Sequence, residues 1–181
     1  MTFSSNELEL ISNKDFLLEK IRVLKNVSST LAEVESGLKP VIHLQEKILP
    51  AGALTKTGKI SRGENYKGLP YLVLDFPRYS SGNQLFIYRT MFWWGNYFLC
   101  LLVTQNCGFK LKSLDNADTF KMNVGPTPWN YDFSDSCWQP LNDKIDHSFI
   151  AIGRKISFED AENLGAISRT TFEDLMSFLT K

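Results

Sequence analysis

The residues with the strongest chemical signature lie between positions 125 and 140, GPTPWNYDFSDSCWQP. Trp129, Tyr131 and Phe133 alternate there with short polar residues, among them Asp132. Large rings beside short polar groups are typical of loops that hold a sugar, a peptide or another ring. Because three prolines exclude a helix, we expect an irregular loop that contributes Trp129, Tyr131 and Asp132 to a ligand site. The alternative is a flap that its aromatic side chains pin onto the core.

A second polar set lies on two expected strands. In a strand over residues 69–76, Tyr71 and Asp75 share one face. A charge among apolar strand residues must be paired or face solvent. Asp75 with Arg78 or Arg89 therefore forms either an acid and a clamp that orient a ligand, or a structural ion pair at the end of adjacent strands.

A third set is basic and lies in the Gly- and Lys-rich stretch 55–68, TKTGKISRGENYKG. Backbone amides in such loops can hold anions, and an arginine fork fits phosphate or carboxylate. We name Lys59, Arg62 and Lys67 as candidate anion-binding residues, and a solvated loop is the simpler alternative. The wider segment 37–90 carries eight bases and three acids, a net charge of +5.

Signatures of metal, nucleotide and hydrolase chemistry are missing from the sequence. It has no Gly-rich phosphate-binding motif, no HExxH, no GxSxG and no EF-hand loop. The two histidines, His43 and His147, are too few for a three-histidine metal site, and no two cysteines form a CxxC pair. We expect no cofactor and no bound metal, although His147 stays open as a general base.

Trp94 belongs to a segment, MFWWGNYF at residues 91–98, that is apolar on both faces of an expected strand. A sheet covered on one side alone would leave large rings in water. The second face must therefore be covered by loop 125–140, by a helix, or by a partner such as the second subunit of a homodimer.

A long amphipathic helix is predicted over residues 13–36, with Ser12 as an acceptable N-cap. Its apolar residues have the spacing of one helical face: Leu17, Ile21, Leu24, Val27, Leu31 and Val34. A heptad spacing also fits a coiled coil, but packing across a sheet explains the same stripe. Gly37 and Pro40 should end the helix. Residues 40–49 form a short helix or a strand, and residues 50–68 read as a long loop.

Strands are predicted in the middle of the chain and helices at its end. The expected strands span residues 69–76 (ending before Pro77), 85–94, 97–104, 109–112 and 148–156, with a tight hairpin at Gly95-Asn96. Ser157 and Thr170 should each open a C-terminal helix. The fold class is therefore α+β, with a mainly antiparallel sheet of about five strands flanked by a long N-terminal helix and C-terminal helices. We expect one domain over residues 1–181: a helical part at 1–49, the sheet at 69–156 and helices at 157–181.

The composition limits the classes of partner that we expect and the compartment in which the protein acts. Twenty Lys and Arg balance twenty Asp and Glu, which makes nucleic acid a poor partner. The sequence shows no signal-peptide pattern and no apolar run long enough to span a bilayer, and the odd number of cysteines fits a reducing compartment. A cytoplasmic protein without membrane contact is the expectation.

These observations predict a non-catalytic domain that binds a small molecule or a protein through its aromatic sheet face and loop 125–140. Two alternatives stay open. One is a small enzyme that acts on an anionic substrate through the basic segment 56–89. The other is a weak single-stranded nucleic-acid binder that stacks bases on its aromatic side chains.

Overall fold

The computed structural model describes residues 2–54, 57–112, 118–141 and 148–180. The described chain begins with two helices, continues with strands and ends with a helix followed by a short strand. The elements are α1 (Ser5–Ser12), α2 (Lys14–Leu44), η1 (Ala51–Ala53), β1 (Lys59–Tyr66), β2 (Leu69–Ser81), β3 (Gln84–Trp93), β4 (Tyr97–Gln105), β5 (Lys110–Leu111), β6 (Lys121–Asn123), β7 (Trp138–Pro140), β8 (Phe149–Ile156), η2 (Phe158–Asn163), α3 (Leu164–Ser177) and β9 (Leu179–Thr180). The α+β class is thereby confirmed.

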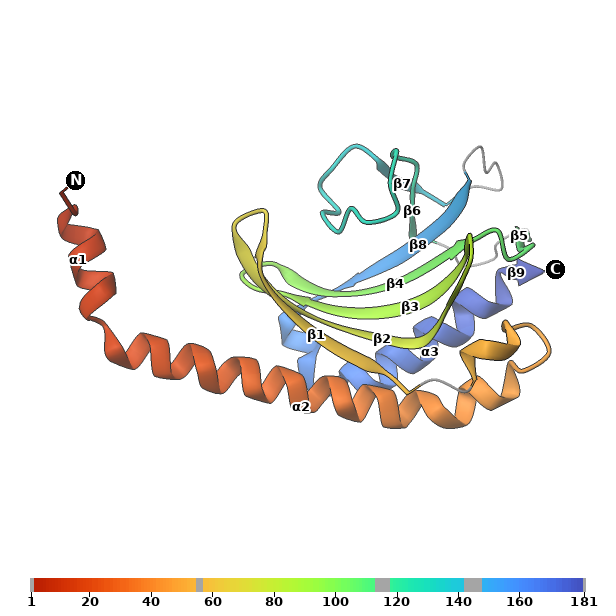
Figure 1. Cartoon of the computed structure of the whole chain (residues 1–181), viewed down its shortest axis with the longest axis horizontal. Coiled ribbons are helices and arrows are strands. Elements are labelled where there is room, and N and C mark those ends of the chain that lie inside the picture. The colour runs from red at the N-terminus through yellow and green to blue at the C-terminus, as the bar shows by residue number, and fades with distance from the viewer. Residues whose placement is uncertain (1, 55–56, 113–117, 142–147, 181) are drawn as a thin grey trace.

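The main sheet has seven strands in the order β1-β2-β3-β4-β8-β6-β7, and every neighbouring pair is antiparallel. The short strands β5 and β9 form a separate pair. Figure 1 shows a curved sheet with α2 and α3 on its convex side and the chain around β6 and β7 on its concave side. The predicted hairpin is confirmed between β3 and β4, where Gly95 adopts a φ of 72°.

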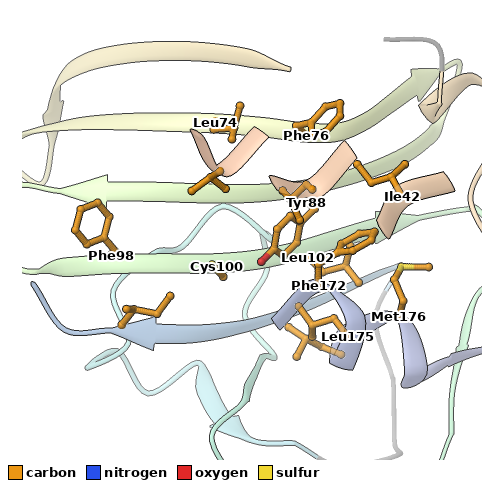
Figure 2. Close-up of a cluster of buried hydrophobic side chains, with 14 of the residues drawn as sticks. Ile42, Leu74, Phe76, Tyr88, Phe98, Cys100, Leu102, Phe172, Leu175 and Met176 are labelled. Atoms are coloured by element: carbon orange, nitrogen blue, oxygen red, sulfur yellow. The ribbon is translucent and has the colours of Figure 1, made fainter. Parts of the chain in front are cut away.

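The convex face of the sheet packs against α2 and α3. Tyr88 and Leu102 of the strands lie beside Phe172 and Leu175 of α3, and Leu74 belongs to the same apolar cluster (Figure 2). Four residues of the predicted stripe, Leu24, Val27, Leu31 and Val34, are buried there, whereas its first two, Leu17 and Ile21, are exposed. Alternate residues of the strands and the buried stripe of α2 therefore meet in one apolar layer.

The concave face of the sheet has its own apolar layer. Val73, Met91 and Leu101 are among its strand residues. Tyr131 and Phe133 cover them from the loop between β6 and β7, and Trp138 covers them from β7. The apolar residues predicted on both faces of the 91–98 strand are thus covered by helices on one side and by this loop on the other. The last three residues of the predicted loop 125–140, Trp138–Pro140, form strand β7.

The predicted end of the long helix at Gly37 and Pro40 is wrong, because α2 continues to Leu44 with Pro40 inside it. Pro40 removes one backbone donor from the helix. However, Leu38, Val41 and Ile42 on either side of it are all buried against the core. Their packing holds the helix together across the missing hydrogen bond.

The loop predicted over residues 50–68 contains strand β1, and the strand predicted to stop before Pro77 continues to Ser81. β1 lies at the sheet edge and exposes most of its side chains, so it shows no apolar alternation. β2 passes Pro77 with a cis peptide bond and a register shift between Asp75 and Arg78. With β1, β6 and β7 included, the sheet has seven strands instead of about five.

Two further boundaries differ at the ends of the chain. Ser157 caps the 3-10 helix η2, and α3 then runs through Thr170, so the prediction that Thr170 opens a helix is wrong. Buried Ser168 and Phe172 lie on one continuous face of α3, which explains the missing break. At the other end, α1 was not predicted; a capping box formed by Ser4 and Glu7 begins it. No helix within the described ranges has the length and apolar content to cross a membrane.

Candidate functional site

Asp75 and Arg89 lie directly opposite each other on β2 and β3, on the concave face. Arg89 donates from Nε to Oδ1 of Asp75 over 2.6 Å and from Nη2 to Oδ2 over 2.8 Å. Its third nitrogen, Nη1, donates to the Tyr131 phenol. The Arg89 guanidinium carbon also lies 5.1 Å from the centre of the Trp129 ring. The fold thus brings together four residues that sequence reasoning had grouped only in part.

The electrostatics of this cluster favour an ion pair over a ligand clamp. The side chains of Arg89 and Asp75 are only 14% and 13% exposed. Burial acts to lower the pKa of Arg89, but the hydrogen bonds that Arg89 donates to Asp75 and Tyr131, with its attraction to the Asp75 carboxylate, more than offset it, so its pKa is raised. Burial raises the pKa of Tyr131. Because all three guanidinium nitrogens already bond protein atoms, Arg89 attaches loop 125–140 to the sheet.

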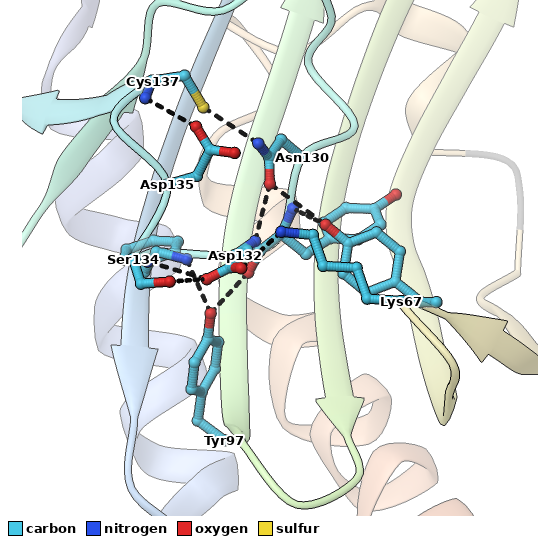
Figure 3. A network of polar contacts seen from close by, with 10 residues as sticks. Lys67, Tyr97, Asn130, Asp132, Ser134, Asp135 and Cys137 are labelled. Atoms are coloured by element: carbon cyan, nitrogen blue, oxygen red, sulfur yellow. Dashed lines mark hydrogen bonds and ion pairs between the residues drawn. The ribbon is translucent and has the colours of Figure 1, made fainter.

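Lys67 and Asp132 attach the loop a second time (Figure 3). Lys67 lies in the turn between β1 and β2, and its Nζ is 2.6 Å from Oδ2 of Asp132. Ser134 donates to the other carboxylate oxygen from its backbone N–H over 3.0 Å and from its hydroxyl over 2.6 Å. These bonds, the one from Lys67 above all, lower the pKa of Asp132 to about 2. Asp132 is therefore a bonded carboxylate at neutral pH.

Two tyrosines that were not predicted as site residues hold the backbone of the loop. The Tyr66 hydroxyl donates to Oδ1 of Asn130 over 3.2 Å and accepts the Tyr131 N–H over 2.8 Å. The Tyr97 hydroxyl donates to the Tyr131 carbonyl and accepts the Phe133 N–H, each over 2.8 Å. Burial raises the pKa of Tyr97 to about 12. Neither position has a sequence signal that separates it from an ordinary strand tyrosine.

A cavity of about 390 Å³ opens where this fastened loop meets the ends of β4 and β8. It is lined by Asn96, Tyr97, Asp118, Thr119, Lys121, Asp132, Phe133, Ser134 and Lys155. Lys155 places its Nζ 5.3 Å from the Tyr97 ring centre. Lys121 donates to the Phe133 carbonyl over 3.4 Å. Within the described ranges, neither lysine takes part in an ion pair.

The remaining predicted residues lie away from this cavity. Arg78 donates to the Thr57 carbonyl over 3.3 Å. Arg62 pairs with Glu64 at 2.6 Å on the face opposite to Lys59. Trp94 packs against the convex core, with its ring edge-on to Phe92, on the other side of the sheet from loop 125–140. Lys59, Arg62 and Lys67 therefore do not converge on one point.

A larger cavity, of about 490 Å³, lies at the other end of the sheet and is lined by residues such as Thr104, Cys107 and Phe109. Ser148 also lines it, directly after the segment 142–147 that lies outside the described residues. Among the described residues, Lys110 is the single charged side chain that lines it, so this cavity carries no functional argument. His147 lies in the same undescribed segment, whereas His43 is exposed near the end of α2. In the parts of the chain that the structure describes, no three His, Cys, Asp or Glu residues are placed to hold a metal ion.

Comparison with known proteins gives no relative to set beside this geometry. No family model, no curated protein and no solved structure matches the chain. The contacts and the cavity described above are therefore the basis for a function.

Proposed function

We propose that this chain is a non-catalytic binding protein that takes a small anionic molecule in the 390 Å³ cavity between loop 125–140 and the ends of β4 and β8. The observation that carries the proposal is the convergence of Lys121 and Lys155 on this cavity without an ion-pair partner among the described residues. Its volume falls within the range of small-molecule sites, roughly 300–1,000 Å³.

The charge balance of the cavity supports an anion. Two lysines and two acids, Asp118 and Asp132, line it, but Asp132 is already neutralised by Lys67 from outside. The remaining charges favour a negative ligand. The hydroxyl of Thr119 adds a donor suited to carboxylate or phosphate oxygens. Lysine binds such groups as a mobile point charge rather than as a fixed fork.

The protonation states of the lining groups support binding without turnover. A general acid or base works best when its pKa lies near the operating pH. The pKa of Asp132 is lowered to about 2 and that of Tyr97 is raised to about 12, so neither exchanges a proton near neutral pH. Both are also held by hydrogen bonds to the loop. The cavity thus offers positioned charge but little acid–base chemistry.

The two alternative functions receive less support. For an enzyme acting through segment 56–89, three of the candidate bases, Arg62, Lys67 and Arg89, are already paired with acids. For a nucleic-acid binder, bases must stack on exposed rings, and the rings of Tyr131 and Phe133 are buried by packing onto the sheet.

The test is calorimetric titration of the full chain with inorganic phosphate and with citrate at low ionic strength. We expect binding that weakens about tenfold in Lys155→Gln and again in Lys121→Gln/Lys155→Gln, since a charge-assisted hydrogen bond contributes about 1.5–3 kcal/mol. Lys59→Gln is the matched control, because Lys59 is an exposed lysine that does not line the cavity. Wild-type protein that binds neither probe, or a control that loses as much affinity as Lys155→Gln, would remove the cavity from the function.

The same samples separate binding from catalysis. Hydrolysis of a simple aryl phosphate by the wild type, abolished in Arg89→Ala, would favour the enzyme alternative instead. We expect no turnover by either protein.

A further inference from the structure

The N-terminal arm, residues 3–21, projects from the body of the protein. Figure 1 shows α1 and the first turns of α2 extending past the edge of the sheet. No residue of α1 is buried, and the first buried residue of α2 is Leu24. The arm is nevertheless rich in apolar side chains. Eight of the eleven exposed large apolar residues in the described part of the chain belong to it: Phe3, Leu8, Leu10, Ile11, Phe16, Leu17, Leu18 and Ile21.

The apolar surface of the arm is broader than a solvent-facing helix requires. At about 100° per residue, Phe16 and Leu17 fall on the same side of α2 as the buried stripe that starts at Leu24. Ile21 widens this surface along the flank of the helix, whereas Leu18 falls on the opposite side. A helix that is apolar over most of its circumference is normally covered. The sheet covers the apolar stripe of α2 only from Leu24 onward. The part of the stripe in the arm therefore exposes an apolar surface that no described residue covers.

The size of this surface matches a stable protein interface. Each of the eight side chains is between 46% and 61% exposed. Taking about 200 Å² for a large apolar side chain, the seven residues other than Leu18 offer on the order of 800 Å², which is what one partner contributes to an interface of standard size. Scattered single apolar residues on a surface need no explanation, but seven exposed along one short helical arm do.

The charges along the arm point to a second copy of the chain as the partner. Residues 3–12 carry two acids, Glu7 and Glu9, and no base, a net side-chain charge of −2. Residues 14–25 carry four bases and two acids, a net side-chain charge of +2. Two arms that run antiparallel about a two-fold axis bring each acidic half beside the basic half of the other arm. A parallel pair would place like charges together.

The same charges argue against a lipid surface. Helices that lie on membranes usually carry Lys and Arg on their polar face, which anionic headgroups attract. The outer half of the arm has only acids there. The net charge of the whole chain is zero, so two copies meet without long-range repulsion.

We propose that the N-terminal arm is a self-association surface through which two copies of the chain pair antiparallel to form a symmetric dimer. Leu17 and Ile21 lie at the centre of the apolar surface, and the pairs between Glu9 of one copy and Lys25 of the other set the direction. The proposal is independent of the cavity, which lies at the ends of β4 and β8.

The primary test is sedimentation equilibrium of the full chain. Interfaces of this size have Kd values of about 1 μM or tighter, so we expect a dimer at tens of micromolar. Leu17→Gln/Ile21→Gln should weaken dimerisation about 100-fold, at about tenfold for each central apolar contact. Gln preserves helix propensity. Leu44→Gln is the matched control, since Leu44 is 79% exposed on the same helix but far from the arm, and it should leave the dimer intact.

A charge exchange tests the antiparallel arrangement. Glu9→Lys and Lys25→Glu should each weaken the homodimer, and an equimolar mixture of the two variants should restore dimers. A mixture that stays as weak as the single variants would overturn the antiparallel pairing. A wild-type chain that stays monomeric up to about 100 μM, well above the Kd expected for such an interface, would overturn the proposal. So would a dimer that survives Leu17→Gln/Ile21→Gln.

Phosphatidylcholine vesicles provide the remaining discrimination. Monomeric wild-type protein that co-sediments with them, when Leu17→Gln/Ile21→Gln does not, would replace the second copy with a lipid surface. We expect no co-sedimentation of the dimer, because its apolar arm residues are then buried.

Discussion

Removal of the Arg89 side chain should release loop 125–140 from the sheet. Arg89→Ala leaves the Asp75 carboxylate unpaired with only 13% of its side chain exposed, and it removes the donor to the Tyr131 phenol. Breaking a buried ion pair costs about 3–5 kcal/mol. The guanidinium stacked near Trp129 adds about 0.5–1 kcal/mol. Because both charges keep some contact with water, we expect the free energy of unfolding to fall by about 3 kcal/mol, the lower end of the range.

The chain contains a matched control at the same distance. Arg62 and Glu64 approach to 2.6 Å, as Arg89 and Asp75 do, but their side chains are 52% and 54% exposed instead of 14% and 13%. Exposed pairs contribute little, because water and salt screen them. We therefore expect Arg62→Ala to leave the stability almost unchanged, so that burial rather than distance explains the difference.

The assay is urea unfolding followed by tryptophan fluorescence for Asp75→Ala, Arg89→Ala and the double variant. The losses of unfolding free energy in the two single variants should add up to more than the loss in the double variant, by at least about 1 kcal/mol. That difference is the coupling energy expected for residues in one network. Amide hydrogen exchange should also rise in loop 125–140 of Arg89→Ala before it rises in β3. An Arg89→Ala variant that loses no more stability than Arg62→Ala, or a coupling energy close to zero, would contradict a stabilising role for the buried ion pair.

Three further predictions follow from single contacts. The pKa of Asp132 is about 2 in the folded protein, below its value of about 3.9 in the unfolded chain. The contribution of Asp132 to stability is therefore complete above pH 4 and is lost as the pH falls toward 2. Urea midpoints should fall less steeply over this range in Asp132→Asn than in the wild type. Tyr88→Phe removes a buried phenol that donates to the Ser168 carbonyl over 2.7 Å, and it should lower the free energy of unfolding by about 1 kcal/mol, measured by the same urea titration. Burial raises the pKa of the Cys100 thiol and closes it off from solvent, so peptide mapping should find Cys100 labelled by a thiol reagent only after unfolding.

The helical stripe of α2 shows what the sequence can predict and where it stops. The spacing from Leu24 to Val34 identifies the buried face correctly, because one side of a helix meets one sheet. The same spacing cannot tell that Leu17 lies beyond the sheet edge while Leu24 lies under it. It also cannot tell that packing carries the helix through Pro40. Coverage and helix length are set by tertiary contacts that periodicity does not encode.

Strand β1 was not predicted from the sequence, for a related reason. A strand at the sheet edge has one partner strand and exposes most of its side chains to solvent. Its sequence is therefore rich in charged and turn-forming residues and lacks alternating apolar residues. Only the pairing of Ser61 with Val73 and its neighbours reveals it as a strand. The buried strands β3 and β4 were predicted because both of their faces are apolar.

The residues of the candidate site also divide into those that the sequence predicts and those that it does not. Trp129, Tyr131 and Asp132 are near one another in sequence, and the prediction grouped them. Their partner Arg89 is 42 residues from Tyr131, and only the antiparallel topology brings the two together. Lys121 and Lys155 were not predicted because the cavity forms where four separate segments of the chain meet. An isolated lysine on a strand carries no signal of its own.

The most direct test of the anion-binding function is a chemical-shift titration of the ¹⁵N-labelled full chain with inorganic phosphate. We predict saturable shifts of the backbone amides of Thr119, Lys121, Ser134 and Lys155, which line the cavity, and their loss in Lys121→Gln/Lys155→Gln. Shifts centred on residues 59–67 instead, or no saturable shift at all, would contradict the account.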